Sequence, residues 1–428
     1  MCSRILKALC RAKPIGSWLK YSTDAETFQL KQISEKFLSG RKVNYTEKLE
    51  LLSPDVLPTY PVYRVLDFDG NVINEANDPK LSKDKCIKLY KDMTLLHTMD
   101  KILLNSQRQG LLAFYMTNYG EEALHVGCSA GLHDDDLIYA QYREVGVILQ
   151  RGFTVFDFMN TAFGNCNDPA KGRQMPMHYG TPKYNFVYIS SPLATQVPQS
   201  VGTAYAFKRA NNGRIVCCFF GDGAASEGDT SSSFNFAGTL ACPVMFVCRN
   251  NGYAISTPTA QQYRGDGVVA RGPGFGLYTI RVDGNDLLAM YNATRTAREM
   301  VAQNKPVLLE AMSYRIGDHS TSDDSTIYRP AGDLEKWNTL VNPIARFKKY
   351  LIKQNFWSEQ DETDWMKKAK EDVLAAFAKA SKAKFPSIDN LFSDVYKKET
   401  KNLKRQKEEL YEHLSAFGDN YPINQHLK

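Results

Sequence analysis

Two short apolar runs, residues 215–220 and 244–248, give the chain its clearest pattern. The first run stops at Gly221-Asp222-Gly223 and the second at Arg249-Asn250-Asn251. A short apolar run that ends in a glycine turn is typical of a buried strand leading into a ligand-binding loop. The residues between the runs have the length and apolar spacing of a helix. Because strand, helix and strand form a βαβ unit, we expect two neighbouring parallel strands whose carboxyl ends lie together.

The rest of the pattern divides the chain into an arm, a core and a helical end. Residues 24–80 are polar and interrupted by prolines, which indicates an extended N-terminal arm with one short strand at 63–66. In residues 81–330 strands alternate with helices, which predicts an α/β domain with a parallel sheet flanked by helices. Residues 331–428 are predicted to be a helical C-terminal tail. Within it, an apolar patch at 391–396 is expected to dock on a partner subunit.

Helical and strand periodicities place further elements around the βαβ unit. A long helix is expected to begin after Ser82, whose hydroxyl is a suitable N-cap. A short apolar strand is expected to deliver Tyr142 and Arg143 at its carboxyl end. The remaining predicted elements, in chain order, are helices at 82–109 and 121–132, a helix that begins with 201–208, and strands at 278–282 and 307–312.

Composition and charge change this picture mainly at the N-terminus. The 428 residues are 43% apolar and 23% charged, which is ordinary for a globular protein with a large core. No run approaches 18 apolar residues, so no transmembrane helix and no membrane partner are expected. The first 23 residues contain five basic and no acidic side chains, with leucine and isoleucine interleaved. This pattern predicts a mitochondrial transit peptide at 1–23, and a disordered basic tail is the alternative.

The net charge argues against a nucleic-acid partner. The whole chain carries +6 and the leader +5, so the remainder carries about +1. No basic surface is then left over for nucleic acid. Nine cysteines are present, but no C-x-x-C occurs and four lie in or beside the apolar strands. They are therefore interpreted as buried small hydrophobic residues.

The edge of the predicted sheet carries a candidate metal site. Asp222 and Asn251 follow neighbouring strands, where open α/β sheets bind their ligands. Carboxylate, amide and main-chain oxygens suit a small divalent cation such as Mg²⁺ when phosphates complete its shell. The flanking glycines would let the backbone approach those phosphates.

Neither of two common glycine-rich nucleotide motifs matches this stretch. A dinucleotide fingerprint would need an earlier third glycine than Gly228 and an acid at the end of the second strand. A P-loop would need Gly-Lys-Ser/Thr, which is missing. A tight turn without a ligand remains the alternative for an isolated Gly-Asp-Gly. The pairing with Asn250-Asn251 one βα unit later is far more restrictive.

The segments GDGAASEGD, FNFAGTLACP and CRNNGYAISTP resemble the thiamin-diphosphate motif, in particular that of the α subunits of branched-chain 2-oxoacid dehydrogenases. The resemblance runs from about Pro61 to the C-terminus and implies the thiamin-diphosphate-binding fold. It implies a Mg²⁺ site made by Asp222, Asn251 and the carbonyl of Tyr253. It also implies that the residues near the cofactor's diphosphate are Gly223, Ala224 and Arg249, with Tyr142 and Arg143 reaching in from another loop.

The segment 171–200 is rich in Gly, Pro and Ser and resembles a loop that holds a structural K⁺ ion in this family. The resemblance places Ser191 and Leu193 on the cofactor side. A plain loop is the alternative, because the residues alone do not indicate a cation. The implied K⁺ positions are Ser190, Pro192, Thr195 and Gln196.

A polar segment at 314–329 follows the last predicted strand and is expected to be a mobile loop. Its His319 suits proton transfer near neutral pH, and a solvent-exposed histidine without a role is the alternative. The segment resembles the family's regulatory loop, which implies that His319 is catalytic and Ser320 phosphorylated. Asp318 stands where relatives carry a second histidine and is expected to raise the pKa of His319. Pro330 occupies the usual second phosphorylation site, which is therefore expected to be absent.

The resemblance implies oxidative decarboxylation of branched-chain 2-oxoacids in the mitochondrial matrix, with transfer of the acyl group to the lipoyl group of an acyltransferase core. Thiamin diphosphate would supply the chemistry, and the glutamate that activates it would come from a β subunit. The chain is therefore expected to work in a heterotetramer of two α and two β subunits, controlled by a kinase and a phosphatase. The alternatives are a pyruvate dehydrogenase α subunit and a non-catalytic scaffold of the same fold.

Overall fold

The computed structural model describes residues 46–53 and 59–428. The predicted transit peptide at 1–23 lies outside the described residues, as does most of the arm before residue 59. The chain separates into two units, Met1–Pro58 and Thr59–Lys428. In the first unit, residues 46–53 contain neither helix nor strand. The elements that follow all belong to the second unit.

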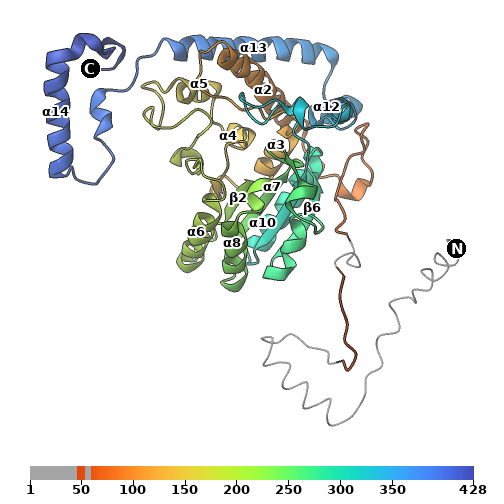
Figure 1. Ribbon diagram of the computed structural model, residues 1–428. Helices are drawn as coiled ribbons and strands as arrows, with labels where there is room; N and C mark the ends of the chain where they lie inside the picture. Colours follow the sequence, from red (N-terminus) through yellow and green to blue (C-terminus); the bar gives the residue numbers. More distant parts are fainter. Residues whose placement is uncertain (1–45, 54–58) are drawn as a thin grey trace. The chain divides into compact units, whose positions relative to one another are not determined.

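A five-stranded parallel sheet organises the second unit (Figure 1). Its strand order is β1-β2-β3-β7-β6. The predicted strands at 278–282 and 307–312 are confirmed, as is the strand before Tyr142. All neighbouring pairs are parallel, so every carboxyl end lies at the same edge. The strand bounds are β1 Leu137–Tyr139, β2 Val216–Gly221, β3 Val244–Asn250, β6 Tyr278–Asp283 and β7 Val307–Met312.

The predicted βαβ unit is confirmed. Helix α8 (Gly228–Thr239) connects β2 to β3, and Gly221 lies opposite Arg249 in the parallel register. Every residue of both strands is buried. The short helix α7 (Asp222–Ala225) starts directly at the end of β2. Asp222 and Asn251 therefore follow neighbouring strands at one edge, as the sequence pattern predicts.

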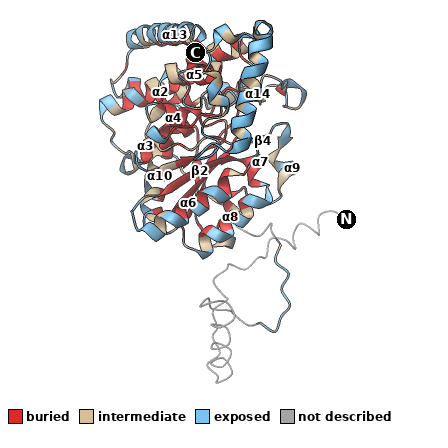
Figure 2. Ribbon diagram, turned by 90° about the vertical axis from the view of Figure 1, so that its left-hand side faces the viewer, coloured by how far each residue is buried: buried red, intermediate tan, exposed pale blue. Residues whose placement is uncertain are grey.

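Two hydrophobic clusters cover the two faces of the sheet, because successive strand side chains point to opposite sides. Cys217 and Phe219 belong to one cluster, whereas Cys218 and Phe220 belong to the other. Helices α6 (Gln196–Ala210) and α8 cover the second face. Figure 2 shows the buried strands between these layers. The helices that contribute to the first cluster are α2 (Lys83–Arg108), α3 (Glu122–Gly131), α4 (Val145–Gln150), α5 (Val155–Phe163), α10 (Leu287–Val301), α12 (Pro343–Lys353) and α13 (Glu359–Ser381).

The cysteines of the strands are buried free thiols, as predicted. Burial raises the pKa of the Cys218 thiol to about 12, so this thiol stays protonated at neutral pH. These cysteines thus act as small hydrophobic residues of the core.

The C-terminal region is helical, which confirms that part of the pattern. Helix α13 packs along α2 and α5 (Figure 1). No residue of α14 is buried, and Leu391, Val395 and Tyr396 of the predicted patch are exposed. None of the helices in the described residues is long and apolar enough to cross a membrane. The helices are α11 Asp333–Leu340, α12 Pro343–Lys353, α13 Glu359–Ser381 and α14 Lys401–Phe417.

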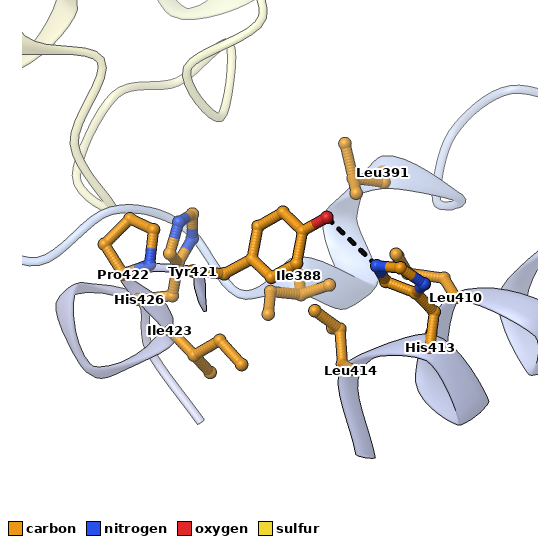
Figure 3. Close-up of a pocket in the computed structure, with 9 residues that line it drawn as sticks. All are labelled: Ile388, Leu391, Leu410, His413, Leu414, Tyr421, Pro422, Ile423 and His426. Atoms are coloured by element: carbon orange, nitrogen blue, oxygen red, sulfur yellow. Dashed lines mark hydrogen bonds between the residues drawn. The ribbon is translucent and has the colours of Figure 1, made fainter. Parts of the chain in front are cut away.

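A small apolar cavity of about 220 Å³ lies within this C-terminal region (Figure 3). Leu410 and Leu414 of α14 face Ile388 across it, and the Tyr421 hydroxyl lies 3.0 Å from His413 Nε2. The cavity shares no residue with the sheet edge that carries Asp222. It therefore belongs to the packing of the tail on itself.

Two predicted elements are corrected. The strand expected at 63–66 is absent, and only single bridges join Tyr63 to Val282 and Leu66 to Val72. The Asp286 carboxylate accepts the backbone N–H groups of Val65 and Leu66, so these donors are not available to a strand partner. Helix α6 starts at Gln196, five residues before 201, so the end of the 171–200 loop is helical.

Glycine at position 127 sets how closely α3 approaches α10. A Cβ at Gly127 would lie 2.8 Å from both the Leu287 carbonyl oxygen and Met290 Cβ, whereas a Cβ at Gly202 in α6 would meet nothing within 4 Å. Gly127→Ala should therefore destabilise the protein by about 1–2 kcal/mol, because overpacking outweighs the gain in helix propensity. Gly202→Ala should be neutral or stabilising by up to about 1 kcal/mol. Thermal unfolding of the two variants checks this, and an equal shift in both would contradict it.

Candidate active site

The expected metal ligands lie at the carboxyl edge of the sheet. Asp222 is 2% exposed, and its Oδ2 accepts a hydrogen bond of 2.8 Å from Gln262 Nε2 at the end of α9 (Thr259–Gln262). Burial raises the pKa of the Asp222 carboxyl, while the Gln262 hydrogen bond and the charge of Arg249 oppose that rise. A positive ion beside this carboxylate would favour its charged form further.

The side chain of Asn251 is held by the buried carboxylate of Glu121. Its Nδ2 donates to Glu121 Oε1 at 2.8 Å, which orients the amide and turns its Oδ1 toward the backbone N–H of Tyr253 at 3.3 Å. Tyr253 begins the two-residue strand β4 (Tyr253–Ala254), which pairs with β5 (Thr257–Pro258). The short hairpin thus follows Asn251 directly and holds the Tyr253 carbonyl near the same edge.

The chemistry of these donors fits a magnesium ion bound to a diphosphate. In residues 46–53 and 59–428, no three His, Cys, Asp or Glu side chains are grouped to hold a metal by themselves. A metal at this edge would need the single carboxylate of Asp222, the amide oxygen of Asn251 and a main-chain carbonyl. Three hard oxygen donors leave room for phosphate oxygens in an octahedral shell, as Mg²⁺ prefers.

Arg249 lies against the turn at the end of β2. A Cβ at Gly221 would be 3.4 Å from Arg249 Nη2. Its Nε lies 2.8 Å from Glu144 Oε1 and 3.0 Å from Glu121 Oε2. Burial alone would lower the pKa of Arg249, but the two carboxylates outweigh it and raise that pKa. The Nε atom of Arg249 is therefore committed to internal ion pairs, an arrangement that the resemblance did not indicate.

Three polar residues that sequence reasoning missed support this edge. Glu144 Oε2 accepts the backbone N–H of Gln141 at 2.7 Å, and Gln141 Oε1 accepts that of Gly221 at 3.0 Å. Glu121 joins Arg249 to Asn251. Their sequence positions could have indicated this supporting role, because Glu144 directly follows Arg143 and Glu121 directly precedes α3.

The glycine at position 223 is required by the hairpin that follows Asn251. A Cβ at Gly223 would lie 2.8 Å from Ala254 Cβ. Ala224 is buried in the second hydrophobic cluster. Both residues lie in α7 directly after Asp222, so they share its position at the sheet edge.

Arg143 and His319 are in direct contact. Arg143 is buried, its Nη1 donates to the Thr117 carbonyl at 2.6 Å, and its Nη2 donates to the His319 carbonyl at 2.7 Å. The same Nη2 lies 3.3 Å from His319 Nδ1. The half-buried ring of Tyr142 meets the imidazole edge-on at 6.0 Å between ring centres. The structure thus brings three residues from two distant loops together, as expected.

The electrostatic environment keeps His319 neutral. Burial, followed by the charges of Arg143 and Arg315, lowers its pKa to about 3. The expectation that Asp318 raises this pKa is wrong. Asp318 Oδ1 accepts hydrogen bonds from the hydroxyl and N–H of Ser325 instead. The carboxylate beside His319 is Asp323, which accepts its backbone N–H at 2.7 Å and offsets the lowering only in part.

The segment 314–329 has more internal structure than its polar composition indicates. Arg315 is 1% exposed and its Nη2 donates to the Ile255 carbonyl at 2.8 Å and to the Tyr328 hydroxyl at 2.7 Å. Tyr328 in turn donates to Asp323 at 2.6 Å. Ser320 is half-buried and adjacent to His319. Hydrogen bonds between polar side chains therefore help to hold this loop in place.

The residues expected to hold K⁺ lie in one turn at the start of α6. Gln196 is buried and its Nε2 donates to the Phe219 carbonyl in β2 at 3.0 Å, which ties the turn to the central sheet. Ser190 and Thr195 are half-buried and Pro192 is exposed. On the expected cofactor side, Ser191 Oγ lies 2.7 Å from His178 Nε2 and Leu193 is exposed. A cation here remains a proposal.

The lowered pKa of His319 can be tested by titrating its imidazole. Because the protonated ring is disfavoured, its titration midpoint should fall well below the ordinary 6.5. In Arg143→Met a neighbouring positive charge is lost, so the midpoint should rise back toward 6.5. Deuterium exchange at the imidazole C2 carbon, followed by mass spectrometry across pH, measures both. A wild-type midpoint at or above 6.5, or no rise in the variant, would contradict the assignment.

Comparison with known proteins agrees with this geometry. The family described as "Dehydrogenase E1 component" matches residues 90–389. Proteins named "2-oxoisovalerate dehydrogenase subunit alpha, mitochondrial" align over most of the chain. The one from Caenorhabditis elegans is 52% identical over 425 residues, 99% of this chain and 98% of that protein. Those from Homo sapiens and Dictyostelium discoideum are 54% and 48% identical, over 90% and 89% of this chain and 87% and 86% of theirs.

The family match covers most of the chain, and the relatives align over nearly their whole length. The parallel sheet and its polar carboxyl edge are those expected of a thiamin-diphosphate-binding fold. This chain belongs to the dehydrogenase E1 component family, whose members depend on thiamin diphosphate.

Proposed function

We propose that the chain is the α subunit of a mitochondrial branched-chain 2-oxoacid dehydrogenase, which decarboxylates branched-chain 2-oxoacids oxidatively and passes the acyl group to a lipoyl arm. Two sets of contacts at the sheet edge carry this proposal. Glu121 links Asn251 to Arg249, and Arg143 links the Thr117 carbonyl to His319. The names and identities of the relatives supply the substrate class.

The metal and diphosphate half of the site would be held by this chain. Asp222, Asn251 and the Tyr253 carbonyl would bind Mg²⁺, while the N–H groups near Gly223 and Ala224 and the guanidinium of Arg249 would bind the diphosphate. When bound, thiamin diphosphate supplies the nucleophilic carbon and the electron sink that decarboxylation requires. Gln196 and its turn would hold a structural K⁺ and so fix the strand β2 that carries Asp222.

His319 would act as a hydrogen-bond donor at its Nε2 atom. Arginine can only donate, so Nδ1 at 3.3 Å from Arg143 Nη2 must accept, and the proton of the neutral ring resides on Nε2. A neutral imidazole in this tautomer can donate to an oxygen of the bound 2-oxoacid and later take part in passing the acyl group on. Tyr142 and Arg143 keep the ring in that orientation.

The glutamate that activates the cofactor would come from a β subunit. A heterotetramer of two α and two β subunits would complete the site, and the exposed residues Leu391, Val395 and Tyr396 offer a surface for that contact. The acyl acceptor would be the lipoyl acyltransferase core of the complex. The chain alone is then inactive, because one essential acid is missing.

Binding of the cofactor distinguishes an enzyme from a non-catalytic scaffold of the same fold. The protein assembled with its β subunit is heated with and without thiamin diphosphate and Mg²⁺. At 100 times the dissociation constant, binding should stabilise the native state by about 2.7 kcal/mol and raise the melting temperature accordingly. The same experiment with EDTA in place of Mg²⁺ should remove most of the shift. No stabilisation under any of these conditions would leave the scaffold as the better account.

Regulation by a kinase and a phosphatase would act at Ser320. A phosphate there would place close to two negative charges beside His319 and against Asp323, and would oppose the loop contacts that hold the ring. Ser320→Ala should therefore block inactivation by the kinase, whereas Ser322→Ala, two residues along the same loop, should not. Inactivation of Ser320→Ala to the wild-type extent would refute this site. Pro330 cannot accept a phosphate, so no second site is expected there.

A further inference from the structure

The backbone at residues 115–120 forms the support on which the His319 loop rests. Its carbonyl groups accept from that loop twice: Tyr119 O from the Ile316 N–H at 3.0 Å and Tyr115 O from the Thr321 N–H at 3.3 Å. Thr117 O accepts from Arg143, which itself holds His319. The position of this support therefore sets the position of both active-site side chains.

The support and the His319 loop pack so closely that neither can shift without the other. A Cβ at Gly317 would lie 2.5 Å from Thr117 Oγ1, and a Cβ at Gly120 would lie 2.2 Å from the Tyr314 carbonyl oxygen. Because neither glycine leaves room for a methyl group, a shift of the support must be passed on to the loop.

One buried carboxylate anchors the support from the core side. Asp100 of α2 is 0% exposed, and its Oδ1 accepts from the Tyr115 hydroxyl at 2.8 Å and from Asn118 Nδ2 at 3.1 Å. Its Oδ2 accepts the Asn118 backbone N–H. Tyr115 and Asn118 are themselves fully buried. Asp100 thus fixes both ends of the stretch that carries the Thr117 carbonyl.

We propose that Asp100 is a positioning residue for the reaction: through Tyr115 and Asn118 it holds the 115–120 backbone on which Arg143 and the His319 loop rest. Asp100 touches neither Arg143 nor His319. Its effect passes through the Thr117, Tyr115 and Tyr119 carbonyls. The consequence for turnover rests on the proposed function, whereas the consequence for the loop does not.

Asp100→Asn in the protein assembled with its β subunit separates positioning from folding. The amide keeps the size of the side chain, but its NH₂ group then faces the Asn118 donors and the support loosens. Amide hydrogen exchange should rise about ten-fold or more at Ile316 and Thr321, with α10 and the central strands unchanged. Turnover should fall about ten-fold with KM changed less than three-fold, because small displacements of catalytic groups mainly affect the chemical step.

Two further variants serve as controls. Tyr115→Phe removes one of the hydrogen bonds to Asp100 and should raise the same exchange rates by a smaller factor. Asp92→Asn neutralises another carboxylate of α2, paired with Lys88 at 2.6 Å, and should leave Ile316 and Thr321 at wild-type rates. Unchanged exchange in Asp100→Asn, or exchange raised equally throughout the sheet and helices, would overturn the proposal. Exchange is measured without substrate, so this result stands even if 2-oxoacids are not turned over.

Discussion

Asp222→Ala is expected to weaken thiamin diphosphate binding in the presence of Mg²⁺ by about 100-fold or more. Asp222 is the single carboxylate among the expected metal ligands, and loss even of an outer partner of a metal site costs 10- to 100-fold in affinity. The effect is larger because the side chain is only 2% exposed, so bulk water cannot take the place of the lost carboxylate. Titration calorimetry of the assembled heterotetramer with thiamin diphosphate and Mg²⁺ measures the change.

Asp229→Ala provides the matched control for this prediction. Asp229 is exposed in the first turn of α8, seven residues after Asp222, so its removal should leave cofactor affinity unchanged. An Asp222→Ala protein that binds the cofactor within a factor of three of wild type would show that the metal does not use this carboxylate.

His319→Ala should lower kcat by about 100- to 1,000-fold, the usual range for loss of a side chain that donates a hydrogen bond to charge developing in the transition state. Cofactor affinity should change less than three-fold, because His319 is not among the residues assigned to the metal or the diphosphate. Steady-state turnover and calorimetry on the same preparation give both quantities.

His413→Ala is the control for His319. His413 lies on the exposed surface of α14 and contacts Tyr421, so it should leave turnover unchanged. A kcat for His319→Ala within three-fold of wild type would remove His319 from the reaction and leave Arg143 and the metal ligands as the functional core.

The apolar pattern predicted the core of this fold because the spacing of buried side chains along a strand or helix can be recognised within a short stretch of sequence. The runs at 215–220 and 244–248 alternate between the two faces of a sheet and could satisfy their burial only between two layers of helices. The position of Asp222 beside Asn251 then followed from the parallel direction of the strands. The N-cap at Ser82 is confirmed for the same reason, since its hydroxyl accepts the Lys85 N–H one turn into α2.

Polar contacts between distant segments could not be predicted in this way. The strand expected at 63–66 does not form, because the carboxylate of Asp286, more than 200 residues away, accepts the N–H groups of Val65 and Leu66. Asp318 is adjacent to His319 in sequence but turns to Ser325, and Asp323 takes its place. The two carboxylates beside Arg249 belong to Glu121 and Glu144, which directly precede α3 and α4. No apolar pattern marks these two positions as a pair.

The substrate preference of the assembled enzyme is the decisive measurement for the proposed activity. This chain is combined with its β subunit, thiamin diphosphate and Mg²⁺, and kcat/KM is compared for 3-methyl-2-oxobutanoate and pyruvate. We expect a preference of roughly ten-fold or more for the branched acid, the scale on which a pocket resolves differences of one or two carbon atoms, and no turnover by this chain alone. Preference for pyruvate, or decarboxylation by the chain without a β subunit, would contradict the account.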